Sequence, residues 1–145
     1  MPEQQSYAKH AKFVPLYHQV LAGIIVLTLI GSFVNLYQSI GDHTRIYSAS
    51  LISALCVALV LLFSFARIFP LKAQDRAIRA EENLRHYVLT GKLLDPRLSL
   101  RQIVGLRFAS DAEFPALAAK AAAEGMSQDD IKKSVKNWRA DYDRL

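Results

Sequence analysis

Two long segments without charged side chains constrain this chain more than any other feature of its sequence. Phe13 to Gly41 is a run of 29 residues without Asp, Glu, Lys or Arg, and Ile46 to Ala66 is a second run of 21. Charge is frequent only from Arg67 onward, where 15 of the 18 basic and 11 of the 13 acidic residues lie. Because the helices of soluble domains carry a charged face, these runs argue against an ordinary soluble domain.

Each uncharged run is long enough to cross a bilayer as a helix. A helix rises 1.5 Å per residue and the hydrocarbon core is about 30 Å thick, so about 20 apolar residues suffice. We expect spans at about residues 16–37 and 47–69, joined by a short loop in which Gly41 and Asp42 favour a tight turn. A signal peptide is the alternative for the first run, but the run is longer than the usual apolar region of about 7–15 residues and a second run follows.

Aromatic residues lie near the ends of both predicted spans. Tyr17 and Tyr37 are 20 residues apart, and Tyr47 and Phe69 are 22 apart. These intervals correspond to about 30–33 Å along a helix, the separation of the two aromatic belts of membrane proteins. We therefore predict that these four residues, together with Arg67, are anchors at the membrane interfaces.

The basic residues that flank the spans predict their orientation. Lys9 and Lys12 precede the first span, whereas the loop contains only Arg45, beside Asp42. Four further basic residues follow the second span: Arg67, Lys72, Arg76 and Arg79. The positive-inside rule then places both termini in the cytoplasm. The predicted organisation is a cytoplasmic segment at 1–15, a transmembrane hairpin at 16–69 and a cytoplasmic helical domain at 70–145.

Small and polar residues predict the faces by which the two spans pack, because lipid provides no hydrophobic drive between helices. The expected contact residues are Thr28, Gly31, Ser32 and Asn35 in the first span and Ser50, Ala54 and Ala58 in the second. No ionisable residue lies in the middle of either span, which argues against a proton relay or an ion-coupled transporter. Cys56, in mid-span, is interpreted as a small apolar filler.

A charged helix is predicted after the second span. Pro70 either kinks a continuous helix or begins a new one, and Gly91 ends it. The predicted apolar stripe consists of Ala73, Ala77, Ala80, Leu84, Tyr87 and Val88. The other face carries Asp75–Arg79 and Glu81–Arg85 at a spacing of four, typical of a self-paired solvated surface, with Glu82 as the expected partner of His86. Alternatively, Lys72, Arg76 and Arg79 contact anionic lipid headgroups.

Three short helices are predicted in the rest of the chain. Ser99-x-x-Gln102 and Ser110-x-x-Glu113 are capping-box patterns, and Ser127 is the expected N-cap of the last helix. The apolar stripe of that last helix is expected at Ile131, Val135, Trp138 and Tyr142. Since no segment alternates with period two, we predict an all-α fold without a sheet.

The sequence gives no support for catalysis. The glycines are scattered, so there is no phosphate-binding loop, and one cysteine with four histidines provides no zinc-site spacing. Two alternatives are a metal shared by His10 and His18, and a membrane enzyme with a site near these residues and Arg67. We predict no cofactor, no metal site and no catalytic residue.

Several stretches resemble a known family. They are the N-terminal pattern Tyr7-x-x-His10-x-x-Phe13-x-Pro15-Leu16-Tyr17-His18 and the segments ARIFPLKAQDRAIRAEENLRHYVLTGK, LDPRLSLRQIVGLRFASDAEFPAL and IKKSVKNWRADY. The chain is similar, over nearly its whole length, to small bacterial two-span membrane proteins grouped only as a domain of unknown function. The resemblance implies an inner-membrane protein of unassigned activity and transfers no functional residues.

Two functions remain open from the sequence. The leading hypothesis is a membrane-anchored interaction or scaffold module that contacts lipid or a partner through the helix at 71–92 and through Arg97, Arg101 and Arg107. The alternative is a homo-oligomeric channel or transporter subunit assembled through the face of Gly31, Ser32 and Asn35. Nucleic-acid binding by the basic residues of the last helix is disfavoured, because the same region contains four aspartates.

Overall fold

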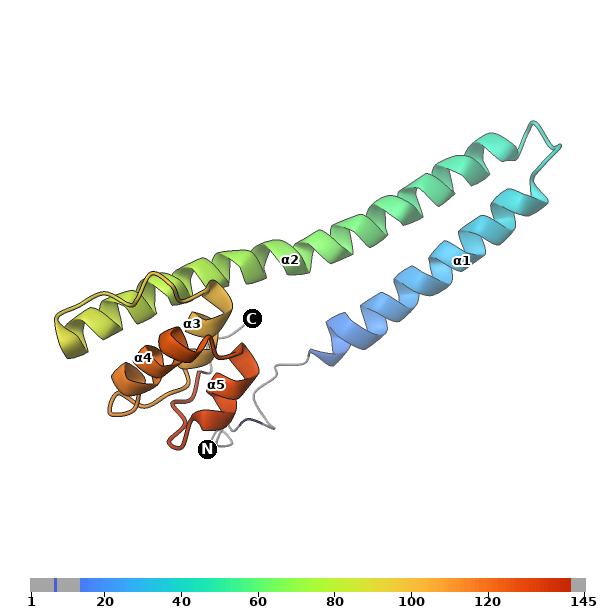
Figure 1. Cartoon of the computed structure of the whole chain (residues 1–145). Helices are drawn as coiled ribbons and strands as arrows, with labels where there is room; N and C mark the ends of the chain where they lie inside the picture. Colours follow the sequence, from blue (N-terminus) through green and yellow to red (C-terminus); the bar gives the residue numbers. More distant parts are fainter. Residues whose placement is uncertain (1–6, 8–13, 142–145) are drawn as a thin grey trace. The chain divides into compact units, whose positions relative to one another are not determined.

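The computed structural model describes Tyr7 and residues 14–141, and within that part of the chain it contains helices and no strands (Figure 1). The predicted all-α fold is therefore confirmed. A π-helical segment, Leu16–Leu21, leads into α1. The α-helices are α1 (Ala22–Gln38), α2 (Ile46–Thr90), α3 (Leu100–Leu106), α4 (Phe114–Glu124) and α5 (Gln128–Ser134). The chain divides into two compact units, Phe13–Pro70 and Leu71–Leu145 with Met1–Lys12.

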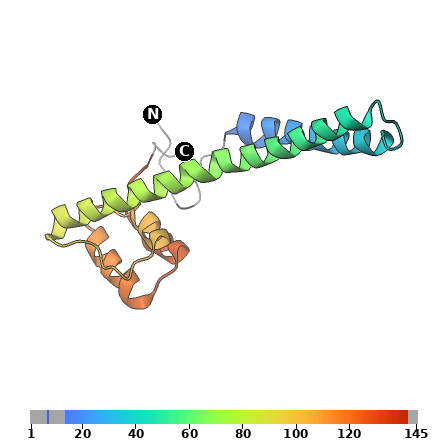
Figure 2. The same cartoon turned by 90° about the horizontal axis from the view of Figure 1, so that it is seen from above.

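The unit Phe13–Pro70 is a helical hairpin. The helical stretch Leu16–Gln38 has 23 residues, about 34 Å at 1.5 Å per residue, and lies antiparallel to the first half of α2 (Figure 2). At the tip, Gly41 has a φ of +92°, and a carboxylate oxygen of Asp42 accepts hydrogen bonds from the amide and hydroxyl of Thr44 at 2.9 and 2.6 Å. Both helices are long and apolar enough to cross a membrane.

The two helices of the hairpin touch through small side chains. The Ser53 hydroxyl donates to the carbonyl oxygen of Ser32 at 3.1 Å, and the Cys56 thiol lies 3.8 Å from the carbonyl oxygen of Thr28. Ser32, Ala49, Ser53 and Cys56 are buried in this contact. Small groups allow the two backbones to approach closely where no hydrophobic drive holds them together.

Helix α2 continues through Pro70 without interruption, so of the two alternatives a continuous helix is the one observed. It ends at Thr90, as the glycine signal predicts. Gly91 adopts a left-handed φ of +74°, and its N–H donates to the carbonyl oxygen of Tyr87 at 2.7 Å. A residue with a side chain is strained in this conformation, which explains why the helix stops there.

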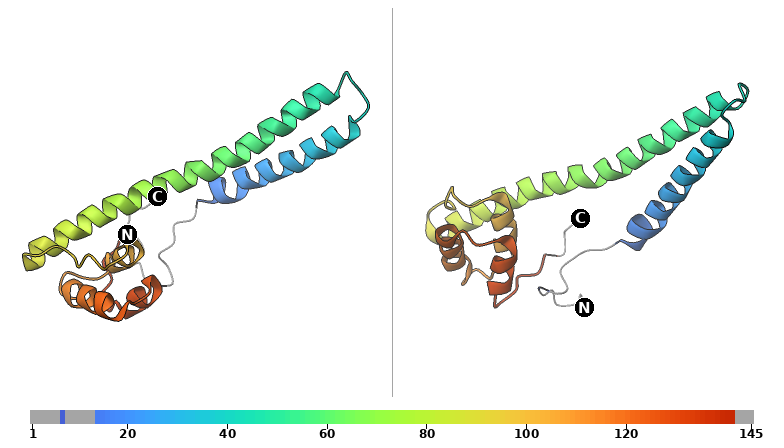
Figure 3. Two further views of the ribbon diagram at one scale, coloured as in Figure 1. Left: turned by 45° about the horizontal axis from the view of Figure 1, so that its top comes forward. Right: turned by 45° about the vertical axis from the view of Figure 1, so that its right-hand side comes forward.

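The second unit packs α3, α4 and α5 into a small apolar core beside the last turns of α2 (Figure 3). Its largest fully buried side chains are those of Leu106, Phe108, Phe114 and Ile131. Gly105 allows α3 to approach α5, because a Cβ atom there would lie 3.1 Å from the backbone oxygen of Gln128.

The predicted caps at Ser99 and Ser127 are confirmed, and the one at Ser110 is wrong. Ser99 and Gln102 form a reciprocal capping box, and Ser127 accepts from the amide of Asp130. Helix α4 instead begins at Phe114 with no side-chain cap. The carboxylate of Glu113 is used elsewhere, since it accepts from the backbone amides of Lys136 and Asn137 at 3.1 and 3.0 Å and from the Asn137 side chain at 2.6 Å.

The last helix is shorter than its apolar spacing predicts. It ends at Ser134, and Val135 is extended with a ψ of 121°. Trp138 then forms an isolated antiparallel bridge with Ala109, and the Arg139 amide donates to the carbonyl oxygen of Phe108 at 2.8 Å. Tyr142, the last residue of the predicted stripe, lies outside the described residues.

Candidate functional site

The half of α2 that follows Pro70 turns a polar face toward the domain and leaves an apolar face exposed, the reverse of the sequence prediction. Ile78 and Glu82 are buried, although Glu82 belongs to the face predicted to be solvated. Leu84 and Val88, predicted to pack, are 63% and 74% exposed. The packed face is therefore held by ion pairs rather than by the expected apolar stripe.

Arg85 is the centre of this packed face. Its guanidinium donates to the Glu82 carboxylate at 2.9 Å, to the Asp111 carboxylate at 2.7 Å and to the carbonyl oxygen of Ala109 at 2.7 Å. It also lies over the Phe114 ring, 4.4 Å from the ring centroid. These contacts replace the predicted Glu81–Arg85 pair and fasten α2 to the α3–α4 connection. His86 also differs from prediction, since its Nδ1 is 2.7 Å from the carbonyl oxygen of Lys92.

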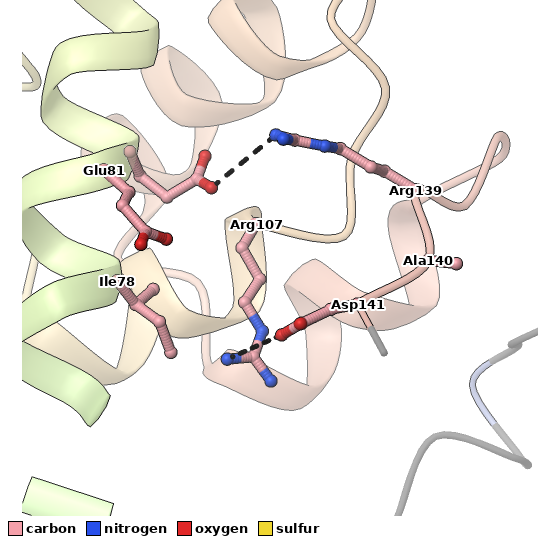
Figure 4. A pocket seen from close by; sticks show the side chains of 7 residues that line it. Ile78, Glu81, Arg107, Arg139, Ala140 and Asp141 are labelled. Atoms are coloured by element: carbon pink, nitrogen blue, oxygen red, sulfur yellow. Dashed lines mark ion pairs between the residues drawn. The ribbon is translucent and has the colours of Figure 1, made fainter. Parts of the chain in front are cut away.

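Two further ion pairs line a depression beside Ile78. Arg139 lies 3.9 Å from the second Glu82 oxygen, and Arg107 lies 3.3 Å from Asp141 (Figure 4). The Arg107 guanidinium also stacks over the Phe108 ring at 4.6 Å. We call Glu82, Arg85, Arg107, Asp111, Arg139 and Asp141 the ionic clamp.

The ionic clamp is suited to holding segments together. Three guanidinium groups face three carboxylates, so the charges balance, and each side chain has an oppositely charged partner within 4 Å. A buried charge is tolerated only when it is paired in this way. Within the described part of the chain, no three side chains of His, Cys, Asp or Glu gather to form a metal site. The ionic clamp therefore holds α2 against the rest of the domain and so determines which faces of these segments remain exposed.

The predicted contact arginines have different surroundings. Lys72, Arg76, Arg79 and Arg101 are exposed. Arg97 is exposed but donates to both oxygens of Asp95, and these hydrogen bonds lower the pKa of Asp95 to about 2. Arg107 is only 6% exposed, which corrects the prediction that it is available to a partner or to lipid.

The predicted interfacial residues include three exposed aromatic side chains, Tyr37, Tyr47 and Phe69. Arg67 is partly buried. Tyr17 packs within the hairpin, since its ring stacks on Phe63 at 4.5 Å and its hydroxyl donates to the Phe63 carbonyl oxygen at 2.7 Å.

The predicted helix contact residues are divided between the hairpin contact and the exposed surface. Ser32 is buried between the helices, whereas Thr28, Gly31 and Asn35 line a shallow groove beside the contact, opposite Ile52. In α2 the predicted positions are Ser50, Ala54 and Ala58. All three are exposed and lie next to the positions that touch α1. Small residues occur on both of these adjacent faces of α2, so composition alone did not distinguish them.

Tyr7, which precedes the hairpin in the sequence, contacts α5. Its hydroxyl donates to the Asp129 carboxylate at 2.8 Å, and the Lys133 ammonium lies 5.6 Å from the ring centroid. The hydrogen bond to Asp129 raises the pKa of Tyr7 above its ordinary value. Tyr7, which precedes α1, and Asp129, which follows α2, therefore meet in one unit.

Sequence reasoning missed that the apolar face of α2 is free. All six residues of the predicted stripe are exposed: Ala73, Ala77, Ala80, Leu84, Tyr87 and Val88. The sequence signal that this side of α2 could be buried was the high density of acidic and basic residues between 75 and 85. Two of them, Glu82 and Arg85, pair with residues distant in sequence, Arg139 and Asp111. Such long-range pairs are not visible in helical periodicity.

The fold defines a class of all-α proteins in which an apolar helical hairpin is joined to a small helical domain. The chain belongs to a family of unknown function, DUF6526, whose model matches residues 1–145. No curated protein and no solved structure matches it.

Proposed function

We propose that this protein is an integral protein of a bacterial cytoplasmic membrane, in which the hairpin is a two-span anchor and the helical domain is a cytoplasmic interaction module. One observation carries the proposal. The hairpin exposes large apolar side chains along both helices, including Leu27 at 71%, Leu55 at 61% and Leu62 at 65%. In water these side chains would form an apolar surface far larger than soluble monomers tolerate, whereas in lipid they are in their preferred surroundings.

The polar groups of the hairpin support this placement. Its charged residues lie at its ends, with Asp42 and Arg45 paired at 3.4 Å in the turn and Arg67 near the end of the apolar run. Hydroxyl groups within the helices donate to backbone carbonyl oxygens, either of their own helix, as Thr28 does to Ile24 at 2.8 Å, or of the other helix, as Ser53 does to Ser32 at 3.1 Å. Polar side chains in lipid are expected to be satisfied in this manner.

The contact between Tyr7 and Asp129 supports an even number of membrane crossings. Tyr7 precedes the first apolar helix, and Asp129 follows the second, yet they share a hydrogen bond of 2.8 Å. Such a contact requires both residues to lie on the same side of the membrane. The excess of basic residues outside the turn favours the cytoplasmic side.

Membrane extraction and labelling test this proposal. We expect the chain to stay in the membrane pellet after alkaline carbonate washing and to be released by detergent. In a Cys56→Ala background, His43→Cys in the turn and Lys120→Cys in α4 both introduce exposed thiols. A membrane-impermeant maleimide should label position 43 in intact spheroplasts and position 120 only after lysis. A soluble chain, or the opposite labelling pattern, would overturn the proposal.

A homo-oligomeric channel or transporter subunit is the second candidate, favoured by the position of Asn35. This amide is exposed on the groove lined by Thr28 and Gly31, and it forms no side-chain hydrogen bond with the described residues. A polar group at such a position is satisfied when another helix covers it. The candidate predicts solute or ion flux through liposomes that contain the protein, reduced by Asn35→Leu. Tight liposomes with wild-type protein would refute it.

A further inference from the structure

The exposed apolar face of α2 is a continuous seam. At 100° per residue, Ala73, Ala77, Ala80, Leu84 and Tyr87 fall within an arc of about 80° around the helix. The positions that face the domain, Ile78, Glu82 and Arg85, are centred roughly 150° away. The ionic clamp therefore uses one side of α2. It leaves the opposite side, which we call the α2 seam, without a partner among the residues that the structure describes.

We infer that the α2 seam binds the same seam of a second copy of this chain, forming a short parallel coiled coil. The five seam residues are spaced four, three, four and three apart, which is the alternation of core positions in a heptad repeat. The three alanines permit close approach of the two helices, and Leu84 and Tyr87 contribute larger apolar area at 63% and 54% exposure. Val88 extends the apolar surface at one edge.

The charges beside the seam favour a second copy over other occupants. Arg76 lies along one edge and Glu81 along the other, and both are exposed. In a parallel pair, the residue before one core position faces the residue five places later in the partner helix. Arg76 of each copy therefore meets Glu81 of the other copy, so the dimer contains two such ion pairs, one along each edge. A lipid surface would place Glu81 against anionic headgroups, which is unfavourable.

The parallel direction rests on the proposed two-span anchor, because every copy then enters the membrane in the same orientation. The seam from Ala73 to Tyr87 extends over about 21 Å, or two heptads. So short a coiled coil is marginal between freely diffusing chains. Anchoring raises the effective concentration of the partner helix and favours the pair in the membrane.

Disulfide cross-linking in native membranes tests the seam. In the Cys56→Ala background, Ala73→Cys and Ala80→Cys each place a thiol on the seam, and Lys72→Cys and Arg79→Cys are matched controls one residue away. Under mild oxidation we expect the seam thiols to form dimers at least about tenfold faster than the controls, because a disulfide needs Cβ atoms about 4 Å apart. Equal rates at adjacent positions, or no dimer, would refute the α2 seam as the interface.

The same cross-linking series reads the direction of the pair. A parallel pair brings position 73 of each copy together, whereas an antiparallel pair centred on position 80 cross-links 80 but separates the two copies of 73 by roughly 21 Å. Cross-linking at 80 without cross-linking at 73 would therefore refute the parallel arrangement.

Charge exchange tests the predicted register. With Ala80→Cys as the reporter, Arg76→Glu or Glu81→Arg alone should slow dimer formation at least about threefold, because each creates two like-charge contacts. The double variant should restore the rate, and Arg79→Glu should have no effect. A double variant as slow as the single variants would refute the Arg76–Glu81 register.

The carbonate extraction described above is run on the same samples and separates the two proposals. Cross-linking failure with the chain retained in the membrane would refute the pairing alone. Cross-linking of a chain found in the soluble fraction would refute the anchor and leave the pairing supported.

Discussion

Removing Arg85 provides the sharpest test of the structural argument for the ionic clamp. Arg85→Met keeps the length and apolar body of the side chain but deletes its charge. The substitution leaves Glu82 buried, with its closest remaining cationic partner, Arg139, 3.9 Å away. It also deprives the Ala109 carbonyl oxygen of its side-chain donor.

The size of the effect follows from burial. The side chains of Arg85 and Glu82 are 11% and 6% exposed, so water screens their 2.9 Å contact only weakly. Removing one partner of such a buried pair costs about 3–5 kcal/mol of the free energy of unfolding. A whole domain is stable by only about 5–15 kcal/mol, and this one is small. We therefore expect Arg85→Met to bring the domain close to unfolding at 25 °C.

Tryptophan fluorescence measures this loss directly. The chain has one tryptophan, and the Trp138 ring lies 4.7 Å from that of Phe108 in the domain, so urea titration in detergent reports that unit. Arg79→Met, exposed on the same helix, is the matched control and should change stability by no more than about 0.5 kcal/mol. Glu82→Leu combined with Arg85→Met should cost less than the sum of the two single substitutions.

A midpoint for Arg85→Met that coincides with that of Arg79→Met would refute the clamp as the contact that holds α2 to the domain. Strict additivity in the double variant would show that Glu82 and Arg85 do not act as a pair.

Three other substitutions test separate contacts. Gly105→Ala should cost about 1–3 kcal/mol by the same fluorescence assay, because its Cβ would lie 3.1 Å from a backbone oxygen of α5, whereas Gly31→Ala, with no atom within 4 Å, should leave the domain unchanged. Glu113→Ala should cost about 1–3 kcal/mol, since two backbone amides lose their acceptor; an unchanged urea midpoint would contradict this. Arg97→Gln should raise the pKa of Asp95 from about 2 toward about 4, measured by NMR titration. Because the folded pKa of Asp95 is lowered, its contribution to folding is present above about pH 4 and is lost as the pH falls toward 2; an unchanged pKa in the variant would refute Arg97 as the cause.

The features that depend on local chemistry were predictable from the sequence. The lengths of the apolar runs predicted the hairpin, and Gly41, Gly91 and Gly125 mark chain reversals or helix ends with positive φ. The capping hydroxyls at Ser99 and Ser127 were predicted because a cap involves only residues three positions apart. The glycine and capping signals each lie within about one turn of chain, where spacing alone determines which atoms meet.

The tertiary structure alone decided which face of each helix is covered. Helical periodicity shows that Ala80 and Leu84 share one side of α2 and that Glu82 and Arg85 share another. The buried side was determined by Asp111 and Arg139, which lie far along the chain, because paired charges can be buried where an unpaired charge cannot. Helix α5 ends early because of similar long-range contacts. Ala109 and Phe108 supply hydrogen-bonding partners for the segment at Trp138 and Arg139, and the apolar spacing carries no information about these contacts.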